Sequence, residues 1–400
     1  MREVKKLQNN ALKTEYFSER VSLGCIALCA VWFMVLSQVP LLRMSETITM
    51  SFRPILILVL LINMLRRGSL QYSVRLVSFA AATWCCFVVL LNDIDLEALK
   101  YAGGVVMYML MFWAVIGIRW NRKELRIIIC IVFISCIICA AAILYSNPIT
   151  DFSVAIKGHL NFLGTSVNRN KNAYVFSLGT VIGLIYLMYG HSIPKLLIFL
   201  GTTVTGYALM YSQCRGAFIC VVAAVFVLVG FRLHEIGKKQ SLKALCLSLL
   251  FLVFVIASYY LIKNSELSRL VDGESTSGRE IGFRRAWEMF VGSDYFGKLF
   301  GNGFMFESRH SDEIGAHLVY LNFLVSSGIV GTLFIVAIML SSLRHIKGCI
   351  PYALYSLALI KTLFEGMEYN FYAALILAVI TYNYTITYGG SIDELFSGTQ

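Results

Sequence analysis

The sequence predicts an all-α, polytopic membrane protein with about twelve transmembrane helices. Three observations support this fold class. Hydrophobic residues make up 58% of the 400 residues and charged residues only 14%, whereas roughly a quarter of a soluble domain is charged. The apolar residues are gathered in blocks long enough to span hydrocarbon, which takes about 17–25 residues. Lysine and arginine are also concentrated in alternate connections, as in proteins that cross a membrane repeatedly.

The apolar blocks predict the individual spans, with edges good to a few residues. They cover residues 21–39, 49–65, 75–92, 99–118, 126–145, 172–190, 194–211, 215–231, 244–262, 318–341, 350–367 and 370–388. The first block follows a basic segment, as the apolar core of a signal peptide does. It is too long for that role and lacks a small-residue cleavage site, so we expect it to be retained as the first span.

The distribution of basic residues predicts that both termini are cytoplasmic. With the N-terminus inside, the following residues fall in cytoplasmic connections: Arg66, Arg67, Arg75, Arg119, Arg122, Lys123, Arg126, Lys195, Arg232, Lys238, Lys239, Lys243, Arg344 and Lys347. This is the positive-inside pattern. The chain then divides into nine spans over residues 1–262, a large outer loop with short helices over 263–316, and three spans with a cytoplasmic tail over 317–400.

The rest of the composition argues against other protein classes. The net charge of +11 is explained by the basic cytoplasmic connections, so we predict no nucleic-acid partner. Most of the eleven cysteines lie in apolar blocks, where a thiol behaves as a small hydrophobe, and no Cys/His spacing predicts a metal site. The five prolines lie at or near span ends. We therefore expect no span to be broken near its centre, as spans of many secondary transporters are.

The large outer loop contains a candidate anion site. Ser277-Gly278-Arg279-Glu280 has the pattern of a capping box and predicts a helix to about Phe290. Phe283, Trp287 and Phe290 recur at helical spacing and would lie on the membrane surface or against the spans. Arg279 in the first turn, beside free N–H groups, would favour phosphate. The alternative is an amphipathic helix with a solvated arginine.

Two other residues on the outer side are candidates for chemistry. Arg215 stands at the outer mouth of the eighth span, in a short turn, where a charge is costly unless it meets a ligand or partner. The alternative is an arginine that snorkels to the interface. His317 lies where the large loop meets the tenth span, and can accept a proton near neutral pH. The alternative is an interfacial histidine that begins a helix.

Further basic residues on the outer side are candidates for substrate binding. They are Arg169, Lys171, Arg284, Arg285, Arg309 and His310. Such a concentration of positive charge suits a ligand with a diphosphate group and a lipid tail in the outer leaflet. Glu365 and Glu368 are expected to pair with neighbours such as Lys361, a structural role. The pair Asp93 and Asp95 has the spacing of carboxylates that hold a metal on a nucleotide-sugar, but a two-residue match carries little weight.

The order of these motifs resembles the O-antigen polymerase and O-antigen ligase family. Cys214-Arg215-Gly216-Ala217 is similar to the Ser-Arg-Gly-Ala signature at the start of that family's domain. The later motifs occur in the family's order: Gly278-Arg279-Glu280, Trp287, Leu299-Phe300-Gly301-Asn302-Gly303-Phe304, His317, Tyr320-Leu321, Gly328 and Gly331. The resemblance covers roughly residues 160–345. Two positions depart from the pattern: Cys214 replaces serine, and Leu318 replaces the asparagine that often follows the histidine.

The resemblance implies a fold similar to C-type (GT-C-like) membrane glycosyltransferases, and transfer of glycan from undecaprenyl diphosphate in the periplasm. It also implies a site in the bacterial inner membrane, with no metal or other cofactor. Carried onto this chain, Arg215 and Arg279 would hold the diphosphate, and His317 would help to deprotonate the attacking hydroxyl. The implied partners are an undecaprenyl-diphosphate-linked oligosaccharide, a glycan or lipid A-core acceptor, membrane lipids and a chain-length regulator.

Several functions stay open on the sequence alone. A polymerase joins one lipid-linked repeat unit to another, whereas a ligase moves the glycan onto lipid A-core. We favour the polymerase because nothing in the sequence points to a particular core acceptor. The alternatives from other classes are a flippase or transporter for lipid-linked glycan and a non-catalytic assembly partner. A transporter requires basic residues along a central cavity, and the candidates for that role are Arg53 and Lys361, both near span ends.

Overall fold

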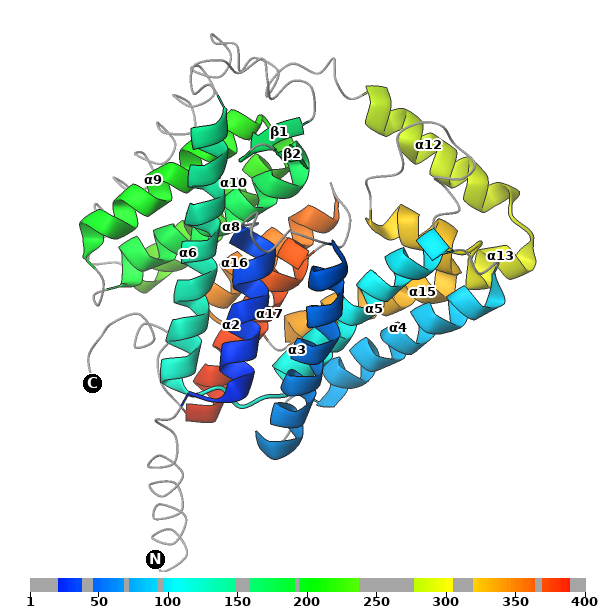
Figure 1. Ribbon diagram of the computed structural model, residues 1–400, viewed down its shortest axis with the longest axis horizontal. Helices are drawn as coiled ribbons and strands as arrows, with labels where there is room; N and C mark the ends of the chain where they lie inside the picture. The colour runs from blue at the N-terminus through cyan, green and yellow to red at the C-terminus, as the bar shows by residue number, and fades with distance from the viewer. Residues whose placement is uncertain are drawn as a thin grey trace, which may run out of the picture.

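In the residues that it describes, the computed structural model of the chain is a bundle of helices with a small hairpin of two strands (Figure 1). It describes residues 21–37, 46–67, 72–92, 96–147, 159–163, 165–190, 194–236, 277–304, 319–344, 346–363 and 369–388. The helices are α2 (Leu23–Ser37), α3 (Glu46–Arg67), α4 (Tyr72–Leu91), α5 (Leu96–Ile116), α6 (Arg122–Ser146), α8 (Arg169–Tyr189), α9 (Lys195–Ser212), α10 (Arg215–Ile236), α12 (Ser277–Gly292), α13 (Tyr295–Phe300), α15 (Val319–Arg344), α16 (Cys349–Thr362) and α17 (Tyr369–Tyr388). The strands are β1 (His159–Phe162) and β2 (Thr165–Asn168).

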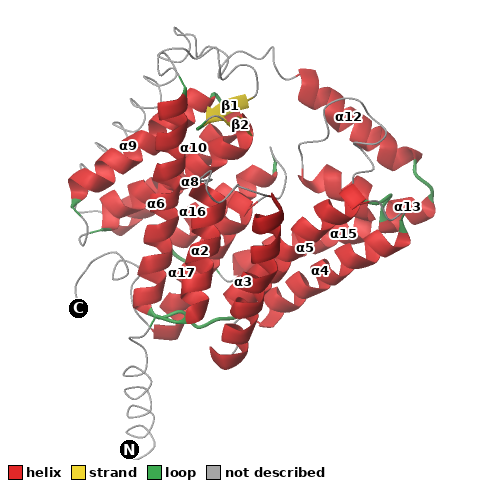
Figure 2. Ribbon diagram, viewed as in Figure 1, coloured by secondary structure: helices red, strands yellow, loops and turns green. Residues whose placement is uncertain are grey.

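The all-α class is confirmed, and Figure 2 shows how little of the described chain is strand. Eleven of the twelve predicted blocks coincide with helices, because a backbone in hydrocarbon must satisfy its own hydrogen bonds. The block at 244–262 lies outside the described residues. Within the described ranges, four helices are long and apolar enough to cross a membrane, namely α4, α6, α8 and α15. These are the candidate spans, and the count of twelve stays a prediction.

Helices α17 and α8 form the centre of the bundle. Every side chain from Phe371 to Asn383 in α17 is buried, as expected for a helix that is apolar on all faces. Helix α8 packs closely on α6 and α9, and a Cβ atom at its Gly183 would lie only 2.1 Å from Oγ1 of Thr202 in α9. Glycines at such positions let membrane helices approach each other closely.

Side-chain contacts show the relative directions of the three helices α8, α10 and α16. The Tyr189 hydroxyl at the end of α8 lies 3.4 Å from Sγ of Cys349 at the start of α16. The thiol of Cys349 also points to the carbonyl of Leu228 in α10, and that of Cys220 to the carbonyl of Leu357, each at 3.7 Å. Helix α16 is therefore antiparallel to both α8 and α10.

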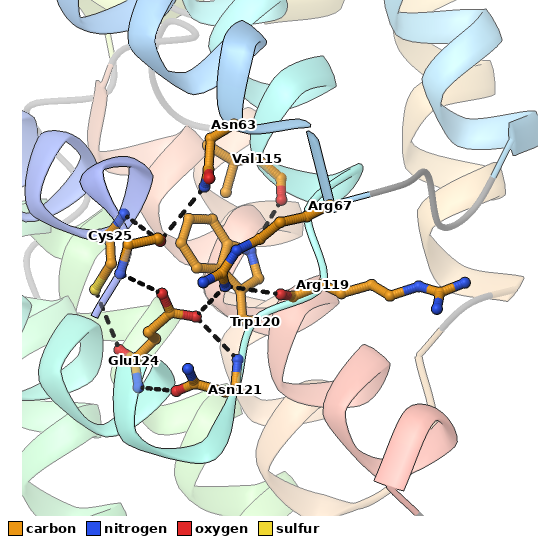
Figure 3. A network of polar contacts seen from close by, with 9 residues as sticks. Cys25, Asn63, Arg67, Val115, Arg119, Trp120, Asn121 and Glu124 are labelled. Atoms are coloured by element: carbon orange, nitrogen blue, oxygen red, sulfur yellow. Dashed lines mark hydrogen bonds and ion pairs between the residues drawn. The ribbon is translucent and has the colours of Figure 1, made fainter. Parts of the chain in front are cut away.

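One end of the bundle is closed by a buried polar network around Glu124, and we call it the Glu124 end (Figure 3). Asn121 caps α6, and the side chains of Asn121 and Glu124 form a complete capping box. The Glu124 carboxylate also accepts hydrogen bonds from Nη1 of Arg67 at 2.6 Å and from the backbone N–H of Ser22 at 2.8 Å. The network joins the ends of α2, α3 and α6.

The opposite end carries the β-hairpin, and we call it the hairpin end (Figure 1). The strands pair antiparallel, with His159 opposite Asn168 and Phe162 opposite Thr165. The Asn147 side chain, just after α6, donates to the carbonyl of Asn161 at 2.7 Å and accepts from its N–H at 3.1 Å. The hairpin is thus fastened to the end of α6 and leads directly into α8.

Helix α15 is interrupted at Gly328, where φ is 68° and ψ is −170°. The expectation that no span is broken is therefore wrong for α15, and the reason is that glycine rather than proline makes the break. The freed carbonyl of Val325 accepts from the N–H of Asn302 at 2.9 Å, and that of Ser326 from the N–H of Gly303 at 3.0 Å. The carbonyl of Ser327 accepts from the indole of Trp84 at 3.2 Å. These bonds satisfy backbone groups that would otherwise be costly in a membrane.

Candidate functional site

Arg169 and Arg215 are predicted site residues that lie at the hairpin end, where they begin the two packed helices α8 and α10. Asn168 ends the hairpin and caps α8 by accepting from the N–H of Lys171 at 3.2 Å, so Arg169 is the first residue of that helix. Lys171 follows in the same turn, with an exposed side chain. The hairpin and the cap therefore fix the point at which α8 and its basic residues begin.

Arg215 begins α10 after a very tight turn from α9. Gln213 adopts the left-handed conformation, with φ of 50° and ψ of 28°, and Cys214 is buried. The carbonyl of Cys214 accepts from the N–H of Phe218, which starts the helix directly after the turn. Arg215 is half-buried, so its guanidinium is held near the bundle rather than in bulk solvent.

The contacts between α10 and α16 show how far along the bundle Arg215 lies. One thiol contact joins Leu228 of α10 to Cys349 of α16, and the other joins Cys220 of α10 to Leu357 of α16. The two contacts are separated by the same number of residues in each helix, so the antiparallel helices stay in register. Continued by five residues, this register sets Arg215 level with Thr362, at the end of α16. Because α8 and α10 pack together, two neighbouring helices begin with an arginine at the same end.

Lys361 adds a buried positive charge below these helix starts. Its side chain is 2% exposed, and its ammonium lies 5.0 Å from the centre of the Tyr174 ring in α8. A charge at this position is expensive in a membrane unless it is held by its surroundings, and a cation over an aromatic face is one such interaction. Lys361 therefore links α16 to α8.

This distribution of charge opposes the helix dipoles. A helix N-terminus carries partial positive charge and is stabilised by acidic side chains. Neither α8 nor α10 has an acidic residue in its first turn, and both begin with arginine. The two helix starts, the two guanidinium groups and the ammonium of Lys361 therefore bring several positive charges to the hairpin end. Such an arrangement is suited to binding an anion with several oxygens.

The glycine motifs of the sequence meet each other in the structure. Gly301 and Gly303 have φ of 90° and 92° and lie between α13 and the break in α15. A Cβ atom at Gly301 would lie 2.3 Å from the carbonyl oxygen of Ser326, and one at Gly328 would lie 2.3 Å from that of Leu299. Two backbones therefore touch here without side chains between them. The motif supports the break in α15 and fastens α13 to it.

The basic residues of α12 lie on a separate arm of the molecule. Figure 1 shows α12 and α13 along the edge of the bundle, where both pack on α15. Nε of Arg284 lies 3.1 Å from Oε1 of Glu288, and the two side chains are 80% and 62% exposed. Arg285 is half-buried. Helix α12 extends from Ser277 to Gly292, close to the predicted extent of 277–290.

Several predicted site residues fall outside the described part of the chain. They are His317, Arg309 and His310, together with the side chain of Arg279, whose backbone belongs to α12. Glu365 and Glu368, which we expected to pair with neighbours such as Lys361, also lie outside it, as do Asp93 and Asp95. The structure thus brings Arg169 and Arg215 to one end, and does not show where the groups from the large loop lie relative to them.

The sequence analysis missed the contact between Lys361 and Tyr174. The available signal was a lone lysine inside an otherwise apolar block, which is a functional candidate by default in a membrane helix. Among the described residues, no group of three His, Cys, Asp or Glu side chains could hold a metal ion. In comparisons with known proteins, neither a family model nor a curated protein matches the chain.

Proposed function

We propose that the protein is a polytopic enzyme of the bacterial inner membrane that transfers glycan from undecaprenyl diphosphate on the periplasmic side. The proposal includes twelve spans and a hairpin end that faces the periplasm. The observation that carries it is the placement of Arg169 and Arg215 at the starts of two packed helices, beside the buried Lys361. This positive end is what a membrane-bound diphosphate requires.

The orientation is supported by the charges at the other end. Arg66, Arg67, Arg119, Arg122 and Lys123 lie at or near the ends of α3 and α6 at the Glu124 end, where the positive-inside rule predicts cytoplasmic residues. The hairpin end is then periplasmic. Its basic residues are not explained by that rule, and a role in ligand binding accounts for them.

The proposed reaction is a displacement at the anomeric carbon. The acceptor hydroxyl forms a new C–O bond from the face opposite the diphosphate, and the bond to the diphosphate oxygen breaks with its electron pair remaining on that oxygen. His317 accepts the hydroxyl proton. Arg215 and Arg279, assisted by Arg169, stabilise the negative charge that develops on the leaving group. Inversion of configuration follows from this geometry, and the arginines supply charge that a metal supplies in other enzymes.

A polymerase is the preferred form of this activity, with a second lipid-linked repeat unit as acceptor and a chain-length regulator as a further partner. A ligase that uses lipid A-core is the alternative. The break in α15 is also compatible with a transporter, because broken helices occur in many transporters. In this chain, however, the freed carbonyls are already bonded to Asn302, Gly303 and Trp84, so they are not available to a transported ion.

A deletion strain distinguishes the three activities. Loss of a polymerase leaves one repeat unit on lipid A-core, loss of a ligase leaves long chains on the lipid carrier, and loss of a flippase traps single units on the inner leaflet. We expect the first pattern on a surface-glycan gel. Complementation with Arg215→Ala, Arg279→Ala or His317→Ala should fail, while Arg66→Ala at the Glu124 end should restore long chains. Normal glycan in all three variants, with protein in the membrane, would exclude the enzyme.

A further inference from the structure

Helix α12 is packed against the bundle on one side. Gly282 and Ala286 are buried on this side. Ala286 packs on Val325 of α15, and Met289 and Phe290 add partly buried surface to the same contact. These residues recur at the spacing of one helix face. The sequence left open whether the apolar residues of this helix meet the spans or the membrane surface, and this face is the one that meets the spans.

The exposed remainder of α12 divides into an apolar strip and a polar strip. The apolar strip consists of Trp287, which is 53% exposed, and Val291, one turn further on. The Trp287 indole lies beside the ring of Phe290, with centroids 5.8 Å apart. The polar strip consists of the exposed ion pair between Arg284 and Glu288. Because the helix turns once in about 3.6 residues, the apolar strip lies between the face on α15 and the polar strip.

The apolar strip distinguishes α12 from a helix on the surface of a soluble protein. Such a helix has two sides, an apolar one toward the core and a polar one toward water. Helix α12 has a third side, on which a tryptophan and a valine are apolar and exposed. A third side of this kind implies a third environment, which is neither the protein core nor water.

Helix α13 extends the exposed apolar surface. The side chain of Asp294 caps this short helix by accepting from the N–H of Gly297 at 2.6 Å. Phe296 and Leu299 are then exposed on its outside, together with Tyr295, whose side chain is 89% exposed. Large contiguous apolar patches on a protein surface mark sites of interaction with a partner or a membrane.

This surface joins the lipid-facing side of α4. Phe300 at the end of α13 stacks on Trp84 of α4 with centroids 5.6 Å apart, and Trp84 lies 5.5 Å from the ring of Phe87. Phe87 and Leu90 are exposed on α4, which is one of the candidate membrane spans. Helix α4 starts after Arg67 at the Glu124 end, so Phe87 and Leu90 lie toward the opposite leaflet. The exposed apolar surface therefore continues from a span to α13 and α12.

We propose that α12 and α13 lie at the surface of the leaflet opposite the Glu124 end, with lipid against the apolar strip and water against the polar strip. Continuity with the lipid-facing side of α4 identifies lipid as the occupant. The side chains agree with this placement, because Trp and Tyr are enriched at membrane interfaces. Helices in the interface bury their apolar side about 5–10 Å into the boundary between headgroups and acyl chains. The inference requires only that α4 crosses the membrane, whether or not the protein transfers glycan.

Fluorescence quenching of Trp287 tests the placement. The full-length protein has five tryptophans, so the Trp287 signal is the difference between the wild-type protein and Trp287→Phe. Both proteins are reconstituted in phosphatidylcholine vesicles, with bromine atoms in the upper part of the acyl chains as the lipid quencher and iodide on both sides of the membrane as the aqueous quencher. We expect the brominated lipid to remove about half or more of the Trp287 signal and iodide to leave it nearly unchanged, because the indole lies at the acyl boundary.

The matched control moves the indole by one position around the helix. In Trp287→Phe combined with Glu288→Trp, the new indole lies on the polar strip, so iodide should quench it and brominated lipid should not. Removing the exposed ion pair with Arg284 has little effect on stability. Trp32 is fully buried in the bundle, and the difference signal from Trp32→Phe gives the response of an indole that is covered by protein.

Three results would overturn the proposal. Quenching of the Trp287 signal by iodide and not by lipid would show that the apolar strip faces water. A response equal to that of Trp32 would show that protein covers the strip, either a second copy or another part of this chain. Equal quenching by lipid of Trp287 and of the indole introduced by Glu288→Trp would show that α12 has no side toward water.

Discussion

Oε2 of Glu124 lies 2.6 Å from Nη1 of Arg67, and the Glu124 side chain is fully buried while that of Arg67 is 26% exposed. The same carboxylate accepts from the N–H groups of Asn121 and Ser22. Arg67 in turn donates to the carbonyl of Arg119 at 3.3 Å. One carboxylate therefore joins the start of α2, the end of α3 and the connection between α5 and α6 (Figure 3).

We predict that Glu124→Ala destabilises the protein by about 2–4 kcal/mol, because it leaves a partly buried guanidinium and two N–H groups without their acceptor. Thermal unfolding in detergent measures the change. The matched control is Glu288→Ala, which removes the exposed ion pair with Arg284 and should cost about 0.5 kcal/mol or less. Equal losses in the two variants would show that burial of Glu124 does not matter.

The second prediction concerns Gly328 in the break of α15. Gly328→Ala should destabilise by about 2 kcal/mol or more, since alanine is strained at positive φ and its Cβ would meet the Leu299 carbonyl. Gly103→Ala and Gly206→Ala are controls in helices α5 and α9, where a Cβ meets nothing within 4 Å. These should be neutral or stabilising by up to about 1 kcal/mol. Unfolding temperatures that fall equally in all three variants would contradict the structure of the break.

The third prediction is energetic coupling between Lys361 and Tyr174. A double-mutant cycle with Lys361→Met and Tyr174→Leu, measured by thermal unfolding, should give a coupling energy of about 1–2 kcal/mol, as expected for a desolvated cation–π contact. Lys361→Arg should retain most of this coupling because the charge is kept. Strictly additive effects of the two substitutions would mean that the ammonium and the ring do not interact.

The fourth prediction tests the attachment of the hairpin. Asn147→Ala removes the hydrogen bonds to both backbone groups of Asn161, which should destabilise the hairpin by about 1–3 kcal/mol. Hydrogen–deuterium exchange should become faster in residues 159–168 and stay unchanged in α16. If exchange in the hairpin is unaffected, Asn147 does not hold it, and the start of α8 at Arg169 must be fixed by other contacts.

The helices could be predicted well from the sequence, because the bilayer forces an apolar block of sufficient length to be helical. The sequence analysis did not predict the capping box of Asn121 and Glu124, although this local pattern with fixed spacing was visible. Its partner Arg67 was not, because that contact depends on how α3 packs against α6. Local signals thus predict elements and caps, but not which distant side chains meet.

The break in α15 could not be predicted for a related reason. The sequence around Gly328 is apolar and compatible with a continuous helix, and only the N–H groups of Asn302 and Gly303 and the indole of Trp84 make the interruption tolerable. Those partners come from the segment just after α13 and from α4, both distant from Gly328 in the sequence. At the hairpin end, the arginines were found as charges near span ends, but the position of Arg215 along the bundle required the register of α10 against α16.

The most direct test of the proposed enzyme is transfer by the purified protein. It is reconstituted in vesicles with an undecaprenyl-diphosphate-linked repeat unit, and the lengthening of the glycan is followed by mass spectrometry. We predict lengthening by the wild-type protein, a loss of about 100-fold or more in Arg215→Ala, a smaller loss in Arg215→Lys, and full activity in Arg66→Ala. Full activity in Arg215→Ala, or no lengthening by correctly folded wild-type protein, would contradict the proposal.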